Sequence, residues 1–436
     1  MNTHTMRTTR RDFLKAATAL VAFPTIIPAS ALGADGRPAP SNRIHLAVIG
    51  LGSRGHDHLG GFMGFPEVQM LAVCDPQRKK AEAAQQRAEK HYAQASARGA
   101  YKGCAASQDF REIITRPDID AVSIASPENW HAIHSLHAMR AGKDVYCEKA
   151  LSLTVAEGRA VCDAVRRYAR VFQIGTQQRS ERGFRFACEL ARNGYLGTVH
   201  TVQVSVPGGT KLPVAPPKPV PTDLDYELWL GPAPWTPYND LKCSYNWYFI
   251  ADYCAGWIES WGVHHIDIAL WGQPALMAST LAVEGTAIFP TEGLANTSLN
   301  WNVLCTPPKG PKLIFTDHKY QEHGVRFMGD KGRVHVTRGS IQTEPEELLE
   351  VKLQPTDERL HESSNHLTNF LDCVKTRRDP VAPVESGHAA TTLTLVADIA
   401  TRLQRKLTWD WTTERFVNDA AANAMLSRAM RSPWTL

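Results

Sequence analysis

RIHLAVIGLGSRG, residues 43–55, decides how the first half of this 436-residue chain folds. An apolar run at 43–49 is typical of a buried strand, and it leads directly into the glycine pattern GxGxxG. A second apolar run at 68–74 ends at Asp75, 20 residues after the last glycine of the pattern. A strand, a glycine-rich turn that opens a helix, and a second strand that ends in an acidic residue predict a dinucleotide-binding βαβ unit.

Each glycine of the pattern has its own expected role. Gly50 permits the tight turn, Gly52 lets a pyrophosphate approach the backbone, and Gly55 lets the helix pack close to the strand. The amino terminus of that helix offers free N–H groups and a partial positive charge to phosphates. Asp75 is expected to accept hydrogen bonds from the ribose hydroxyls of adenosine and to repel a 2′-phosphate. The sequence therefore favours NAD over NADP, a preference that two nearby basic side chains, Arg78 and Lys79, moderate.

Strands and helices continue to alternate up to residue 175, which predicts a parallel sheet with helices on both faces. Ligands of such sheets lie at the carboxyl ends of the strands. The further elements expected are strands at 119–125, 144–147 and 171–175 and helices at 130–141 and 154–169. The cofactor site is expected at the strand ends and the glycine-rich turn, at Gly50, Leu51, Gly52, Ser53, Arg54, Gly55, Asp75, Ser126, Pro127, Asn129, His131, Glu148 and Lys149.

Several short motifs resemble, in their order and spacing, those of one protein family. They are Gly50-Leu51-Gly52, Cys74-Asp75, Ser126-Pro127-x-x-x-His131, Ala141-Gly142-Lys143, Glu148-Lys149, GWIESWGVHHID at 256–267 and Gly329-Asp330-Lys331-Gly332. With the tail at 365–411 they are similar to the glucose–fructose oxidoreductase, inositol dehydrogenase and rhizopine-catabolism (Gfo/Idh/MocA) family. The resemblance implies an α/β fold: a Rossmann domain with a doubly wound parallel sheet, then an α/β domain with a large open, mostly antiparallel sheet. It also implies a homodimer or homotetramer.

The second half agrees with this expectation, because it is rich in strand patterns with few helices between them. Strands are expected at 199–206, 281–288, 298–304, 312–316 and 333–337, and two closing helices at 365–376 and 389–405. A proline-rich segment at 208–237 is expected to form a surface excursion, either an arm toward a neighbouring subunit or a lid. The predicted domains are a signal peptide at 1–31, a linker at 32–42, a Rossmann domain at 43–177 and a substrate-binding and oligomerisation domain at 178–436.

The resemblance implies chemistry at Lys149. Family members oxidise a sugar or cyclitol hydroxyl by passing hydride to the nicotinamide, and a base near the hydroxyl must take its proton. Lys149 matches the lysine of the family's Glu-Lys-Pro motif, with Ala150 in place of the proline. It acts either as that base or by stabilising developing alkoxide charge.

The second catalytic candidate implied by the resemblance is His264, which matches the histidine of the family's Asp-x-x-x-His signature. Ser260 stands where relatives carry the aspartate. A serine cannot hold the charge that would favour a protonated His264. His264 is therefore expected to be a neutral hydrogen-bond partner, unless Glu259 or Asp252 replaces the missing carboxylate.

Seven of the 11 tryptophans lie between residues 229 and 301, and aromatic faces suit the apolar C–H faces of sugars, although most are expected to pack in the core. The expected substrate-binding residues are Arg179, Trp247, Asp252, Tyr253, Trp257, His265 and Asp267, of which His265 is equally suited to helix packing. Adjacent histidines on a helix point about 100° apart, so no metal site is expected at His264 and His265.

The first 31 residues are predicted to be a twin-arginine export signal. Arg10-Arg11 precedes an apolar run at 16–27 and the small residues Ala29-Ser30-Ala31. That run is too short for a bilayer span, which needs about 20 residues. The twin-arginine export machinery would carry the folded protein to the periplasm, with no stable span in its mature form; cleavage and a retained anchor both stay open. The nine cysteines form no CxxC motif and are expected to be mostly free, with a Cys243–Cys254 disulfide as the open alternative.

Charge and location narrow the expected functions. The net charge is +4, of which the first 31 residues carry +3, so the body lacks the basic surface that nucleic-acid binding requires. The leading expectation is an NAD-dependent oxidoreductase for a sugar, glycoside or cyclitol. Because the periplasm has no free NAD pool, the cofactor is expected to stay bound and be recycled. The alternatives are a redox-neutral glycoside hydrolase, lyase or epimerase that acts through a transient keto-sugar, and a non-enzymatic, cofactor-loaded sugar-binding protein.

Overall fold

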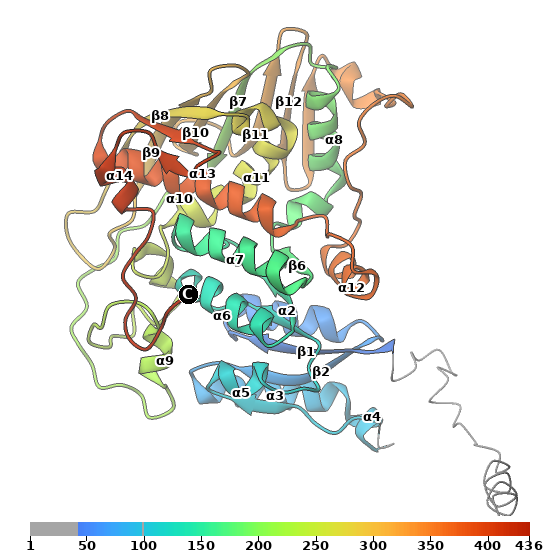
Figure 1. The fold of residues 1–436 in the computed structure, drawn as a ribbon, viewed down its shortest axis with the longest axis vertical. Helices are drawn as coiled ribbons and strands as arrows, with labels where there is room; N and C mark the ends of the chain where they lie inside the picture. Colours follow the sequence, from blue (N-terminus) through green and yellow to red (C-terminus); the bar gives the residue numbers. More distant parts are fainter. Residues whose placement is uncertain (1–41, 98–99) are drawn as a thin grey trace, which may run out of the picture. The chain divides into compact units, whose positions relative to one another are not determined.

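The computed structural model describes residues 42–97 and 100–436, and residues Ile44–Leu436 form one compact unit (Figure 1). The expected signal peptide at 1–31 and nearly all of the expected linker lie outside the described residues. Within the described part, no helix is both long and apolar enough to cross a membrane.

The first half forms a parallel sheet of six strands in the order β3-β2-β1-β4-β5-β6. Its central strands are buried apolar runs because helices cover both faces of the sheet (Figure 1). Thr154 caps the last of these helices by accepting a hydrogen bond from the backbone N–H of Glu157. The strands are β1 (Ile44–Ile49), β2 (Val68–Cys74), β3 (Ala105–Ser107), β4 (Ala121–Ile124), β5 (Asp144–Cys147) and β6 (Phe172–Ile174). The helices are α2 (Ser53–Met63), α3 (Arg78–His91), α4 (Ala93–Ala97), α5 (Phe110–Ile114), α6 (Glu128–Arg140) and α7 (Val155–Tyr168).

The second half forms a mixed sheet of nine strands in the order β13-β12-β11-β7-β10-β9-β8-β14-β15. Only β7 and β10 pair in parallel, so the sheet is mostly antiparallel, as expected. The long helices α8, α11 and α13 pack on one face of it, over a core that includes Val202, Phe315 and Phe327 (Figure 1). The strands are β7 (Val199–Val206), β8 (Thr280–Ile288), β9 (Asn300–Thr306), β10 (Lys312–Asp317), β11 (Gly324–Gly329), β12 (Arg333–Thr337), β13 (Ser340–Glu344), β14 (Leu407–Asp410) and β15 (Arg415–Phe416). The helices are α8 (Arg182–Arg192), α9 (Tyr226–Leu230), α10 (Trp257–Ser260), α11 (Gly262–Gly272), α12 (His366–Thr376), α13 (Val384–Leu403) and α14 (Ala420–Ala424).

Every strand expected in this half is present, but the apolar patterns missed four. β11 is bounded by glycines, β13 carries mostly exposed polar residues, and β14 and β15 are short. Helix α13 begins at Val384, five residues before the expected start, because Pro383 serves as its N-cap residue.

The proline-rich segment at 208–237 packs on the parallel-sheet half. The backbone N–H of Arg78 donates to the carbonyl of Asp223 at 2.8 Å, and the N–H of Asp225 donates to the carbonyl of Pro76 at 2.9 Å. Tyr226 and Leu230 of α9 are buried in a small core of their own. The segment is therefore anchored beside the end of β2.

All nine cysteines are unpaired, and eight of them are buried. Cys243 and Cys254 are among them, so the open alternative of a disulfide between these two is not formed.

Candidate active site

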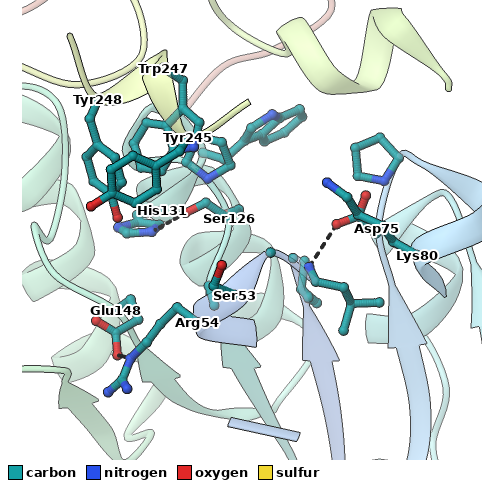
Figure 2. A pocket seen from close by; sticks show the side chains of 18 of the residues that line it. Ser53, Arg54, Asp75, Lys80, Ser126, His131, Glu148, Tyr245, Trp247 and Tyr248 are labelled. Carbon is teal, nitrogen blue, oxygen red and sulfur yellow. Dashed lines mark hydrogen bonds and ion pairs between the residues drawn. The ribbon is translucent and has the colours of Figure 1, made fainter. Parts of the chain in front are cut away.

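A cavity of about 960 Å³ lies at the carboxyl ends of the parallel strands, and its far wall comes from the second half of the chain. Figure 2 shows Asp75 and Lys80 at one end, Arg54 and Glu148 at the other, and Ser53 between them. Fourteen predicted site residues line it: Gly50, Leu51, Gly52, Ser53, Arg54, Asp75, Ser126, Pro127, His131, Glu148, Lys149, Trp247, Trp257 and His264.

The glycine-rich turn has the geometry that its pattern predicts. Gly50 has a φ of +87°, and a Cβ there would lie 2.5 Å from the backbone nitrogen of Ser126. A Cβ at Gly55 would lie 1.9 Å from the carbonyl oxygen of Gly50, so this glycine lets the helix touch the turn and does not line the cavity. A Cβ at Gly52 would meet nothing within 4 Å. The backbone at Gly52 is thus open to a ligand.

Asp75 fits the role of a ribose acceptor at the end of β2. Its carboxylate accepts hydrogen bonds from the backbone N–H groups of Leu51 at 2.8 Å and Gln77 at 2.9 Å, which fix its position beside the turn (Figure 2). Burial raises its pKa, and nearby Lys80 works against that rise. Lys80 lines the cavity, whereas Arg78 and Lys79 do not. The basic side chain that tempers the charge of Asp75 is therefore Lys80.

Glu148 is the centre of a charged cluster at the other end of the cavity. Its Oε1 accepts from Arg54 Nε at 2.7 Å and from Gln177 Nε2 at 3.0 Å, and lies 2.9 Å from His58 Nε2. Burial alone would raise the pKa of Glu148, but Arg54 and His58 outweigh it and hold the pKa well below its ordinary value. Glu148 is therefore a carboxylate that orients Arg54 at the first turn of α2.

His131 ties two strand ends together. Its ring nitrogens lie 2.8 Å from the carbonyl oxygen of Ser126 and 2.6 Å from that of Ala150, and burial lowers its pKa. The peptide bond between Lys149 and Ala150 is cis. The histidine thus holds the backbone at Ala150, directly after Lys149, against the loop after β4.

Lys149 reaches across the cavity to the second half of the chain. Its Nζ donates to Ser260 Oγ at 2.6 Å and lies 3.8 Å from Glu128 Oε1. The same nitrogen lies 5.5 Å from the centre of the Tyr248 ring. Only 13% of its side chain is exposed. A cation at this position is held by an uncharged hydroxyl, an aromatic face and one carboxylate.

His264 lines the cavity, and its side chain is buried. Burial, with the positive charges of Lys149 and Arg338, lowers its pKa well below the ordinary value. Its Nδ1 has no hydrogen-bond partner. Asp252 does not line the cavity, and Glu259 accepts from the backbone N–H of Ala255 at 2.8 Å, so neither gives His264 a counter-charge. The ring is neutral, and its buried Nδ1 has no hydrogen-bond partner.

The other predicted site residues lie outside the cavity lining and have partners of their own. Arg179 and Asp267 bind each other. His265 Nδ1 lies 3.1 Å from the carbonyl of Ser205, and Tyr253 packs edge-on against Trp229. Asn129 donates its side-chain amide to the carbonyl of Leu230 at 3.3 Å.

Sequence reasoning missed several lining residues. Tyr248 stacks on Trp247 with ring centres 3.8 Å apart, and the guanidinium of Arg338 lies 5.0 Å above the Trp261 ring. Gln177 and Lys80 also line the cavity. The YNWYF stretch at 245–249 carried a usable signal, since its aromatic residues surround the predicted Trp247. Arg338 follows β12 on a turn with no motif, so no local pattern could have found it.

Two family models match the chain. The NAD-binding Rossmann fold of the oxidoreductase family matches residues 44–176, and the C-terminal alpha/beta domain of the same family matches residues 201–436. The chain belongs to the Gfo/Idh/MocA oxidoreductase family. Its Rossmann half is accordingly a nicotinamide-cofactor domain.

The curated relatives of this Gfo/Idh/MocA protein align with it over only part of their length. An uncharacterized oxidoreductase, YrbE of Bacillus subtilis, is 26% identical over 38% of this chain and 45% of its own. An alpha-N-acetylgalactosaminidase of Shewanella oneidensis is 31% identical over 36% of this chain and 37% of its own. The chain thus spans less than half the length of these relatives.

Solved structures with the same fold cover nearly the whole described unit. The aldose-aldose oxidoreductase of Caulobacter crescentus, complexed with glycerol, has a TM-score of 0.59 at 19% identity, covering 84% of this chain and 99% of that one. The WlbA dehydrogenase of Bordetella pertussis, in complex with NADH and UDP-GlcNAcA, has a TM-score of 0.61 at 13% identity, covering 84% and 98%. At these identities the likeness establishes the fold.

Proposed function

We propose that this protein is an NAD-dependent oxidoreductase that transfers hydride between a tightly bound nicotinamide cofactor and a hydroxyl or ketone of a sugar, glycoside or cyclitol. One observation carries the proposal: a single cavity joins the glycine-rich turn and Asp75 to Lys149, His264 and an aromatic wall. The residues expected to bind the cofactor and those expected to act on the substrate therefore line the same cavity.

The cavity fits a dinucleotide. The open backbone at Gly52 would receive the pyrophosphate, and Asp75 would accept from the ribose hydroxyls of adenosine. When bound, a nicotinamide supplies the acceptor for hydride. Trp247 and Tyr248 form a stacked aromatic surface next to Lys149, which suits the C–H face of a sugar ring.

Lys149 would handle the proton of the reacting hydroxyl. In the oxidation direction the substrate O–H proton moves to Nζ, and in the reduction direction Nζ returns a proton to the new alkoxide. The Ser260 hydroxyl, 2.6 Å away, holds Nζ in place without adding a charge. His264, which lines the cavity as a neutral ring, would hydrogen-bond the same substrate oxygen or its neighbour.

The pattern at 1–31 supports export by the twin-arginine route and a periplasmic site of action. A dehydrogenase without a cytoplasmic NAD pool must regenerate its cofactor in place. We therefore propose a resident cofactor that a second sugar re-oxidises or re-reduces, in a protein that is a homodimer or homotetramer.

The first test is the nucleotide content of the natively exported protein. The mature protein is purified and denatured, and the released nucleotide is identified by mass spectrometry. About one NAD or NADH per chain is expected, and a panel of sugar pairs scored on products then identifies substrates. Absence of nucleotide, together with no binding of added NAD or NADP, would contradict the proposal and favour a sugar-binding protein.

A second candidate function is favoured by the similarity to the alpha-N-acetylgalactosaminidase, although that match covers little more than a third of either chain. A redox-neutral hydrolase, lyase or epimerase would oxidise a sugar, eliminate a substituent or invert a centre, and then reduce the product on the same cofactor. Aryl glycosides distinguish the two: release of the aryl group without a second sugar supports the redox-neutral reaction, and strict dependence on a second sugar supports the coupled one.

A further inference from the structure

Two carboxyl groups lie directly behind Lys149, outside the cavity lining. Glu128 is the first residue of α6 and Glu259 belongs to α10, and both are fully buried. One oxygen of each and the Sγ of Cys254 lie within 4.8 Å of one another. Lys149 Nζ is 3.8 Å from Glu128 Oε1. Lys149, the catalytic candidate, therefore lies next to one member of a buried carboxyl pair to which both halves of the chain contribute.

Each carboxyl group has one satisfied and one unsatisfied oxygen. Glu259 Oε2 accepts from the backbone N–H of Ala255 at 2.8 Å, and Glu128 Oε1 accepts from that of Ala150 at 3.4 Å. Glu259 Oε1 and Glu128 Oε2 are buried without a partner. Buried oxygens rarely stay unsatisfied. A proton on one of the two carboxyl groups gives it an O–H donor, and an oxygen of the other carboxylate is the acceptor type that such a donor requires.

We propose that Glu128 and Glu259 share one proton, with Glu259 as the neutral acid and Glu128 as the carboxylate, and that this pair is a positioning device that presents a single negative charge to Lys149. The inference rests on the role proposed for Lys149 above. The carboxyl pair would supply the negative charge of the aspartate that the family resemblance implies at position 260.

Charge balance favours one proton over none or two. Two ionised carboxylates in a dry site would repel each other and would hold Lys149 as a permanent cation. Two protons would remove the negative charge at Glu128, 3.8 Å from Lys149 Nζ. Burial and the charge of Glu128 raise the pKa of Glu259 well above its ordinary value, and Glu128 is the nearer of the two to Lys149. The proton therefore belongs to Glu259.

A metal ion is the competing occupant, because two carboxylates and a thiol are potential ligands. A thiol binds metal as the thiolate. Burial and the two carboxylates raise the pKa of Cys254 well above its ordinary value, and its Sγ donates to the carbonyl of Gly256 at 3.7 Å. The thiol therefore stays protonated, and the Lys149 side chain already lies 3.8 Å from Glu128 Oε1. Both features favour a proton over a divalent cation in this cluster.

Other titratable groups face this arrangement. Tyr248 and Cys254 lie beside the pair, and the charge of Asp398 in α13 acts on Glu259. Lys149 also faces Glu148 and His264. All stay unchanged in the variants below, so differences between those variants report on the pair.

The test compares Glu128→Gln with the matched variant Glu259→Gln. The readout is the pH midpoint at which Lys149 becomes reactive toward acetic anhydride, followed by mass spectrometry, so no substrate is needed. Glu259→Gln should leave the midpoint within about 0.3 units, because the amide donates to Glu128 as the acid did. Glu128→Gln should lower it by about 1–3 units, since the opposite charge is lost. Equal shifts, or the reverse order, would overturn the proposal.

Infrared spectroscopy tests the proton directly. The protonated-carboxyl C=O band of the wild type should disappear in Glu259→Gln and persist in Glu128→Gln. If Glu128→Gln does not fold, the wild type and Glu259→Gln alone decide this point. A stoichiometric metal in the natively purified protein that Glu259→Gln loses would overturn the proposal. Neither readout depends on turnover, so a failed sugar panel and a failed carboxyl pair remain distinguishable.

Discussion

Lys149 Nζ and Ser260 Oγ lie 2.6 Å apart, although 111 residues of sequence separate them. This contact joins the end of the parallel sheet to α10 of the second half. A serine can accept from the lysine without fixing its charge, whereas the aspartate of relatives would hold it as a cation. The contact thus holds Lys149 in place and adds no charge beside it.

Ser260→Asp tests this contact. A new carboxylate beside Lys149 favours its protonated form, so the pH at which oxidation reaches half its maximum should rise by about one unit or more. The measurement is the pH profile of the first turnover on any sugar found active. Ser260→Ala, which removes the hydrogen bond without adding charge, is the matched control and should lower activity without raising that pH. An unchanged profile in Ser260→Asp would place the residue outside the reaction.

Lys149→Ala should keep the bound nucleotide and lose turnover by about 10²–10⁴-fold, the usual contribution of a general acid or base. The nucleotide is measured by mass spectrometry and turnover by product formation. Lys352→Ala, an exposed lysine far along the chain, is the control and should change neither. Equal turnover in both variants would remove Lys149 from the mechanism.

The sequence predicted the fold because its signals are local. Apolar runs such as Val199–Val206 and the turn at Gly50 depend on neighbours a few residues away. The cavity lining depended on motifs, and there Lys149 and His264 were found. Arg179 and Asp267 were predicted to contact substrate but do not line the cavity, because they bind each other across 88 residues of sequence. The local sequence around a charged residue does not indicate whether its side chain faces a ligand or pairs with another side chain.

Arg179 and Asp267 should therefore matter for stability. Their guanidinium and carboxylate make two hydrogen bonds of 2.7 and 2.8 Å in the buried interior. Asp267→Asn leaves Arg179 buried and unpaired, which should cost about 3–5 kcal/mol of unfolding free energy. Urea unfolding measures this, and an Arg179→Leu, Asp267→Leu double variant should recover part of the loss. A raised KM with an unchanged free energy of unfolding would instead indicate that both residues contact the substrate.

Asp75→Ala should weaken NAD binding about tenfold or more, because a hydrogen bond to a charged group contributes about 1.5–3 kcal/mol. It should also relax discrimination against NADP, since Lys80 beside it would then meet the 2′-phosphate unopposed. Fluorescence titration of the nucleotide-free protein with both cofactors measures the two effects. Asp372→Asn, an exposed residue of α12, is the control. Unchanged NAD affinity in Asp75→Ala would mean that the ribose is held elsewhere.

Acid stability should depend on Glu414, in the turn between β14 and β15. It accepts from Arg159 at 2.5 Å and lies 2.9 Å from His388 Nε2. Burial opposes ionisation, but these two partners outweigh it and lower the pKa of Glu414 to about 2. A depressed carboxyl pKa stabilises the fold above the unfolded value of about 4.3 and loses that contribution as the pH falls toward the folded value. Urea midpoints of Glu414→Gln should therefore lie below wild type at pH 6 and converge with it near pH 2–3. The control is Glu292→Gln, at an exposed residue, whose urea midpoints should equal those of wild type at every pH. If the urea midpoints of Glu414→Gln stay below wild type by the same amount down to pH 2, the ion pair is not the source of the acid sensitivity.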